Sequence, residues 1–170
     1  MSTEDLIELF HHRWAPPALA LLGERGGGRF VELQRRLGVG RESLRRALDR
    51  LVDLGYVAHN TGYGHPLRPE YVLAPRGRTA SRLALRVLGA GDPETLLHKW
   101  SVPVLAELAS ERRFSELRAA LPGVTPRALA LALQELEGAG LLRREVRATR
   151  PPSTAYHATA AGRRVQRALR

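Results

Sequence analysis

The sequence contains no cysteine and only one lysine among its 170 residues. Without cysteine the chain can form no disulfide, no thiolate metal site, no thiol redox sensor and no cysteine nucleophile. Its six histidines lack HxxxH or HExxH spacing, and no serine stands in a nucleophile-elbow motif. The glycine run at 26–28 lacks the Lys-Ser/Thr of a phosphate loop. We therefore expect a protein that is not an enzyme and that uses no metal or cofactor.

Long apolar runs are also missing. The longest, Trp14 to Gly23, contains two prolines and is too short to span a bilayer. Acidic residues stand where a signal peptide would need positive charge, namely Glu4, Asp5 and Glu8. The hydrophobic fraction of 44% is nevertheless high enough for a packed core. These features predict a folded cytoplasmic protein.

Positive charge is in excess, with 27 Lys+Arg against 17 Asp+Glu and a formal net charge of +10. Such an excess favours a polyanionic partner, and double-stranded DNA is the first candidate. Because all but one of the basic residues are arginine, codon bias is an alternative source of this charge.

An internal repeat organises the chain. Residues 30–33 (FVEL) recur as 114–117 (FSEL), and Leu44, Leu48, Leu51 and Gly55 recur 85 positions later as Leu129, Leu133, Leu136 and Gly140. A colinear series at a nearly constant offset indicates a duplicated unit of roughly 85 residues. We expect two domains, 1–89 and 92–170, with Asp92 capping a helix that starts at Pro93.

Each repeat has the order of a winged helix-turn-helix. In the first repeat, apolar spacing predicts helices over 30–37 and 41–54 around a Gly38-Val39-Gly40 turn. Strands are expected at 56–59 and 70–73, joined by the Gly/Pro-rich connector 61–69, and a closing helix over 78–88 follows. The expected fold is therefore α+β but mostly α, with two fused winged helix-turn-helix units that form a pseudo-dimer.

The second repeat resembles HxlR-type winged-helix transcription factors. The resemblance lies in His98-Lys99-Trp100, Arg113 to Leu117, Leu121 to Thr125, Gly140 to Arg144 and the Thr159-x-x-Gly162 turn. It implies a DNA-binding regulator, usually a homodimer of single units, so that two fused units would act as one pseudo-dimeric chain in which further dimerisation stays open. Some members of that family sense electrophiles through a cysteine, and this mechanism cannot apply here.

Arginine-rich positions are the candidate DNA contacts, because the planar guanidinium fork suits both phosphates and guanine edges. On the second helix of the first motif they are Arg41, Ser43, Arg45, Arg46 and Arg50. The same helix of the second motif keeps only Arg127 and Gln134 and has Ala130 and Leu131 where the first has Arg45 and Arg46. The wings add Arg68 in the first repeat and Arg143, Arg144, Arg147 and Arg150 in the second. The alternative for these charges is a solvated helix face. If they do contact DNA, the two repeats divide base reading and phosphate binding, and the site is an imperfect palindrome.

The two tryptophans occupy matching places, Trp14 and Trp100, each two residues after a histidine, His12 and His98. Core packing is the simpler interpretation. The alternative is a site for an aromatic or planar effector, which would make the chain a small-molecule-binding winged-helix protein with a reduced DNA role. A third interpretation is a protein-interaction adaptor that uses the apolar stretch 128–133.

Overall fold

The computed structural model describes residues 1–60, 70–148 and 153–170. Contacts divide the chain into two compact units. The N-terminal unit is His12–Arg86, and the C-terminal unit combines Val87–Arg170 with the first eleven residues, Met1–His11. This division differs from the expected domains 1–89 and 92–170 in where the first residues pack. They form helix α1 (Thr3–Phe10), which contacts α7 (Ser101–Glu107), and Thr3 Oγ1 donates a 2.6 Å hydrogen bond to Glu107 Oε1.

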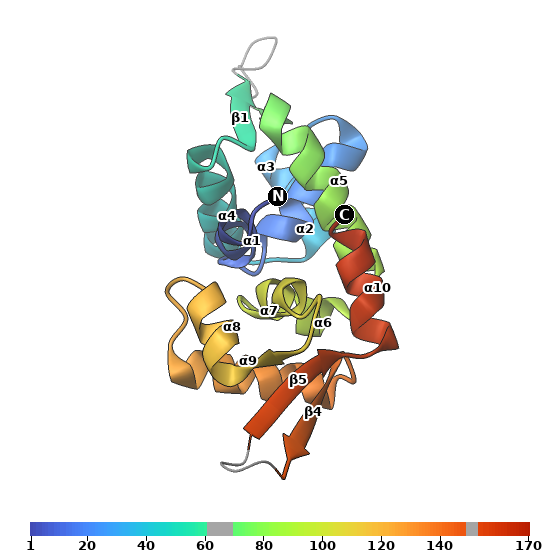
Figure 1. The fold of residues 1–170 in the computed structure, drawn as a ribbon. Helices are drawn as coiled ribbons and strands as arrows, with labels where there is room; N and C mark the ends of the chain where they lie inside the picture. Colours follow the sequence, from blue (N-terminus) through green and yellow to red (C-terminus); the bar gives the residue numbers. More distant parts are fainter. Residues whose placement is uncertain (61–69, 149–152) are drawn as a thin grey trace, which may run out of the picture. The chain divides into compact units, whose positions relative to one another are not determined.

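The described residues of the N-terminal unit form three helices, a two-stranded antiparallel sheet and most of a fourth helix (Figure 1). Its elements are α2 (Ala15–Arg25), α3 (Phe30–Leu37), α4 (Arg41–Asp53), β1 (Val57–Asn60), β2 (Glu70–Leu73) and α5 (Pro75–Gly89). Helix α3 ends at Leu37, and the next residue, Gly38, has a left-handed φ of 61° that turns the chain toward α4. Helix α4 buries Leu44, Ala47, Leu48 and Leu51 at the spacing of one helix face, so its other face is left for solvent.

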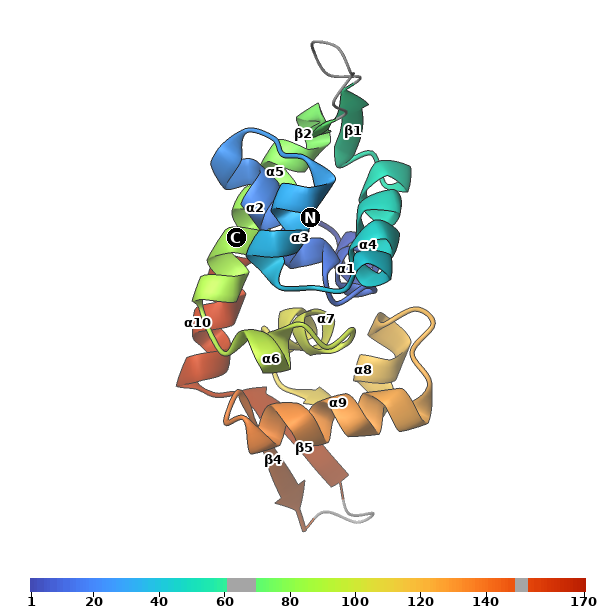
Figure 2. The same ribbon diagram turned by 180° about the vertical axis from the view of Figure 1, so that it is seen from behind.

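The C-terminal unit also has two consecutive helices followed by a β-hairpin and a last helix, and it has in addition α6 (Pro93–Leu96) and a third strand (Figure 2). After α6 and α7 come β3 (Arg112–Arg113), α8 (Phe114–Ala120), α9 (Pro126–Gly138), β4 (Leu142–Arg147), β5 (Ser153–Ala158) and α10 (Ala160–Ala168). The strands form one antiparallel sheet in the order β3-β5-β4. Helix α9 buries Leu129, Ala132, Leu133 and Leu136.

The two hairpins share one register. His59 pairs with Tyr71 in the first, while Arg144 pairs with Tyr156 in the second, each residue 85 positions after its counterpart. Helices α4 and α9 both have 13 residues and also begin 85 positions apart. The pairing that fixes each hairpin therefore follows the spacing of the sequence repeat.

In each unit, a glycine near the start of the last helix lies against a backbone carbonyl oxygen, and these two carbonyls are 85 positions apart in the sequence. A Cβ atom at Gly77 would collide with the carbonyl oxygen of Tyr56, and one at Gly162 with that of Leu141. These two carbonyls also accept hydrogen bonds of 3.0 and 3.1 Å from the amides of Ala74 and Thr159. Only glycine lets this helix approach so closely the chain that leaves the preceding helix.

The helix at 30–37 and the strand at 70–73 are confirmed at their predicted bounds. The closing helix of the first repeat was predicted to start at Arg78 but starts at Pro75, because proline suits the first turn of a helix. The short strand β3 was not predicted. The expected connector 61–69 lies outside the described residues.

Asp92 caps α6 as predicted, accepting hydrogen bonds from the amides of Glu94 at 3.4 Å and Thr95 at 3.0 Å. No helix in the described part of the chain has the length and apolar character needed to cross a membrane. The described residues also contain no cluster of three or more His, Asp or Glu side chains that could hold a metal ion.

Candidate nucleic-acid interface

The solvent face of α4 carries most of the predicted base-reading residues. Arg41, Ser43, Arg45 and Arg46 are exposed, while Arg50 is half-buried. The apolar face of the helix places them there, since the buried leucines fix the rotation of α4 about its axis. The structure thus brings these five predicted positions onto one helix, four of them open to solvent.

Two of these arginines share an acidic partner on the same helix. Arg45 donates two hydrogen bonds to Glu42, of 3.1 and 2.9 Å, and Arg46 donates one of 3.0 Å to the same carboxylate. Asp49 lies 3.5 Å from Arg45 on the other side. The hydrogen bonds from Arg45 and then Arg46 lower the pKa of Glu42, and the bond to Glu42 raises the pKa of Arg45. Both guanidinium groups are therefore held in place. The carboxylates of Glu42 and Asp49 neutralise part of the positive charge on this face of α4.

Arg41 is in a different environment at the start of α4. Its guanidinium lies over the ring of Phe30, 5.8 Å from the centroid, in the range of a cation–π contact. Among the described residues, no carboxylate lies within ion-pair distance of Arg41. Of the arginines at 41, 45 and 46, Arg41 alone keeps its full positive charge uncompensated within the described structure.

The exposed face of α9 has fewer cationic residues than that of α4. Thr125 caps the start of this helix, and its hydroxyl accepts a 3.1 Å hydrogen bond from the amide of Ala128. Arg127, Ala130, Leu131 and Gln134 are exposed at the spacing of one face, and Leu131 is 54% exposed. Only the first and last of these four can donate a hydrogen bond to a base edge.

The wing of the C-terminal unit supplies the remaining predicted residues. Arg143 and Arg144 on β4 are exposed. Arg68 of the first wing and Arg150 of the second lie outside the described residues. The antiparallel pairing of β4 with β5 holds the backbone beneath Arg143 and Arg144.

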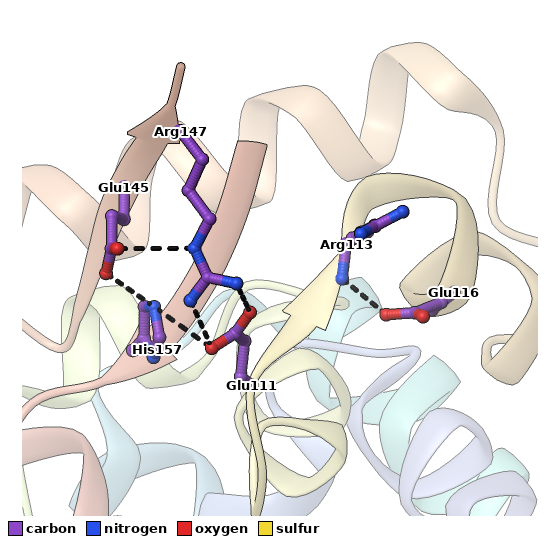
Figure 3. Close-up of polar contacts among 6 residues, drawn as sticks. All are labelled: Glu111, Arg113, Glu116, Glu145, Arg147 and His157. Atoms are coloured by element: carbon purple, nitrogen blue, oxygen red, sulfur yellow. Dashed lines mark hydrogen bonds and ion pairs between the residues drawn. The ribbon is translucent and has the colours of Figure 1, made fainter. Parts of the chain in front are cut away.

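Arg147, the last residue of β4, forms ion pairs with two carboxylates (Figure 3). Its guanidinium lies 2.7 Å from Glu111 and 3.3 Å from Glu145, and His157 Nε2 lies 3.1 Å from Glu145 and 3.8 Å from Glu111. The hydrogen bonds to Glu111 and then Glu145 raise the pKa of Arg147, and Arg147 in turn lowers the pKa of Glu145. Sequence reasoning missed Glu111, because 36 residues separate it from Arg147.

A second contact in Figure 3 shapes the entry to α8. Glu116 accepts a 2.6 Å hydrogen bond from the backbone amide of Arg113, which is the half of a capping box that a glutamate at the third helical position supplies. The corresponding bond at α3, from the Arg29 amide to Glu32, measures 3.4 Å. The first helix of each motif thus starts with the same type of cap.

The predicted effector residues lie in two different units. His12 and Trp14 are half-buried in the N-terminal unit. Trp100 is buried in the C-terminal unit beneath Lys99, whose Nζ lies 4.9 Å from the ring centroid, and His98 Nδ1 lies 2.8 Å from Glu135 Oε2. Burial and this contact account for Trp100 and His98, and an effector role for the four residues stays a prediction.

Comparison with known proteins identifies the C-terminal part of the chain. Residues 95–170 match the family model described as HxlR-like helix-turn-helix, so this segment is an HxlR-like helix-turn-helix domain. Over 77 residues the chain is 42% identical to the uncharacterized HTH-type transcriptional regulator sll1512 of Synechocystis. This match covers 45% of the chain and 57% of that protein. It is 39% identical over 69 residues to the uncharacterized HTH-type transcriptional regulator YdeP of Bacillus subtilis, covering 40% and 54%.

A crystal structure of a MarR-family transcriptional regulator from Enterococcus faecalis V583 is also similar. It shows 36% identity and a TM-score of 0.43 over 45% of this chain and 70% of that one. The chain spans about half the length of the curated relatives that it matches. Both of these curated relatives are described as HTH-type transcriptional regulators.

Proposed function

We propose that the whole chain, whose residues 95–170 form an HxlR-like helix-turn-helix domain, is a DNA-binding transcriptional regulator. The observation that carries the proposal is the exposed face of α4, where Arg41, Ser43, Arg45 and Arg46 stand in the helix that enters the major groove in winged helix-turn-helix proteins. Arginine in that position can contact both guanine edges and phosphates.

The two units contribute unequally in this proposal. Helix α4 supplies base contacts, and Arg143 and Arg144 on the second wing supply phosphate contacts. Arg127 and Gln134 are the base contacts left to α9, since Ala130 and Leu131 cannot donate hydrogen bonds. Arg147, held by Glu111 and Glu145, orients the wing more than it neutralises phosphate.

The proposal treats residues 1–89 as a diverged copy of residues 92–170, so that one chain is a pseudo-dimer. The shared hairpin register at an offset of 85 and the matching glycines at 77 and 162 support this. Because the α4 and α9 faces differ, the preferred operator is an imperfect inverted repeat. Selection from random duplexes would test this point, and a perfect inverted repeat as the outcome would contradict it.

A titration with DNA from upstream of the protein's own gene tests the function. Fluorescence anisotropy at two salt concentrations should show that affinity falls as salt rises. The slope of log K against log salt concentration should be about −0.9 for each phosphate contact, with roughly six to eight contacts in total. The double variant Arg45→Ala/Arg46→Ala should lose specific binding. The matched control Arg35→Ala/Arg36→Ala removes two adjacent exposed arginines from α3 and should retain the sequence preference. Salt-independent binding, or an equal loss in both variants, would overturn the proposal.

A further inference from the structure

A cavity of about 260 Å³ lies beside the start of α4 in the N-terminal unit. It is lined by Phe30, Arg41, Arg45, His59 and Tyr71. Three of the five are aromatic rings and the other two are arginines. Its volume falls just below the roughly 300–1,000 Å³ of ordinary ligand pockets, which suits a ligand of one or two rings.

The aromatic wall is built by backbone pairing. His59 on β1 and Tyr71 on β2 are direct partners in the hairpin, and their rings lie 4.6 Å apart at an angle of 50°. Tyr71 also exchanges two backbone hydrogen bonds with Gly28, of 3.0 and 2.9 Å, which tie β2 to the segment just before Phe30. The sheet and its link to the segment before α3 therefore position the backbones that carry these two rings.

The two arginines of the cavity are not equivalent. Arg45 is already compensated by Glu42 and Asp49, whereas Arg41 has no carboxylate partner among the described residues and lies over Phe30. An incoming anion would therefore pair with Arg41, which can hold a carboxylate through two parallel hydrogen bonds. The planar body of the same ligand would contact Phe30, His59 and Tyr71.

We propose that this cavity binds a planar aromatic carboxylate, with its carboxylate on Arg41 and its ring against the His59–Tyr71 pair. Cation–π geometry at Arg41 and Phe30 keeps the guanidinium above an aromatic face, so the ligand ring and the charge are recognised together. The site is distinct from the tryptophan and histidine residues considered above as effector contacts.

The C-terminal unit lacks the residues for a second such site. The positions 85 residues after Arg41 and Arg45 are Pro126 and Ala130, and the residue that pairs with Tyr156 is Arg144 in place of a histidine. One ligand per chain is therefore expected.

Ligand binding should also oppose DNA binding, a consequence that rests on the proposed function. The carboxylate would occupy Arg41, and the ring would lie beside Arg45, both of which face DNA in that proposal. The two ideas separate in experiment, because ligand binding is measured without DNA.

Isothermal titration of the full chain with 2-naphthoate tests the site. We expect binding of one equivalent, and weaker or no binding of 2-naphthalenemethanol, which lacks the charge, and of cyclohexanecarboxylate, which lacks the aromatic ring. Arg41→Gln should weaken 2-naphthoate by about tenfold or more, as expected for a lost charged hydrogen-bonding group. Tyr71→Leu should weaken it as well, while Arg35→Gln, with the same charge change on exposed α3, should not.

Circular dichroism checks that each variant is folded, and because Arg41 is exposed, its substitution should leave the fold intact. No heat of binding at millimolar 2-naphthoate would overturn the proposal. So would binding that survives Arg41→Gln but is lost in Trp14→Leu, which would assign the ligand to the tryptophan site. Binding of 2-naphthoate by a chain that fails to bind DNA would support the cavity and contradict only the proposed function.

Discussion

The guanidinium of Arg45 donates two hydrogen bonds to the carboxylate of Glu42, with Nε–Oε2 and Nη2–Oε1 distances of 3.1 and 2.9 Å. Because Arg46 uses the same carboxylate, one acidic residue limits two of the cations proposed to contact DNA. These bonds lower the pKa of Glu42, and its ionised carboxylate holds both arginines at neutral pH.

Glu42→Gln should therefore raise DNA affinity by about two- to fivefold at low salt, the range expected when one exposed ion-pair partner is removed. The reason is that both guanidinium groups become available to phosphates. Anisotropy titrations would measure the effect. Asp53→Asn makes the same charge change at the exposed end of α4 and serves as the control. Equal gains in the two variants would mean that net charge alone matters.

Substitutions of Arg144 and Arg147 in the second wing should have different effects in the same assay. Arg144→Gln is expected to weaken DNA binding and to reduce the salt slope by about 0.9, because the proposed function assigns a phosphate contact to this exposed arginine. Arg147→Gln should change the slope little but lower the urea midpoint of the C-terminal unit, since Glu111, Glu145 and His157 lose the cation between them. The opposite order of effects on the salt slope would contradict this assignment.

Local signals in the sequence predicted the elements well where neighbours along the chain decide them. The leucine spacing and Gly38 were enough for α3 and for the turn into α4, because a left-handed residue ends a helix whatever lies around it. The two-residue strand β3 was missed, because it exists only through pairing with β5, more than 40 positions away.

The same distinction explains the site. The exposed face of α4 follows from helical periodicity, so Arg41, Arg45 and Arg46 could be assigned to solvent from the sequence. The contact of Arg147 with Glu111 could not, since it depends on how β4 lies beside the segment before β3. Likewise, no local pattern indicates that α1 packs on α7 or that Tyr71 lies beside His59.

Gly162→Ala should destabilise the protein by about 1–3 kcal/mol, the usual effect of overpacking. The new Cβ would meet the carbonyl oxygen of Leu141, and this oxygen already accepts a hydrogen bond from the amide of Thr159. Gly138→Ala is the matched control in α9, where nothing lies within 4 Å of the added Cβ, and it should stabilise by about 0.4–1 kcal/mol. Urea denaturation would measure both. Similar effects of the same sign would show that the close approach at Gly162 is absent in solution.

Asp92 provides a pH-dependent test of the helix cap that starts the second repeat. The hydroxyl of Thr95 donates a 2.9 Å hydrogen bond to its carboxylate and its amide another of 3.0 Å, and these bonds lower the pKa of Asp92 below its value in the unfolded chain. The unfolded state then binds the proton more readily, so the charge stabilises the folded state above about pH 4. This stabilisation is lost as the pH falls through the lowered pKa of the folded state.

Asp92→Asn should retain the cap without the titration, because asparagine caps helices about as well as aspartate. The difference in unfolding free energy between the wild type and Asp92→Asn should therefore be constant at neutral pH and shrink below pH 4. Urea denaturation of both proteins between pH 3 and pH 7 would measure it. A difference that stays constant down to pH 3, or grows on acidification, would mean that the charge of Asp92 contributes nothing to the start of α6.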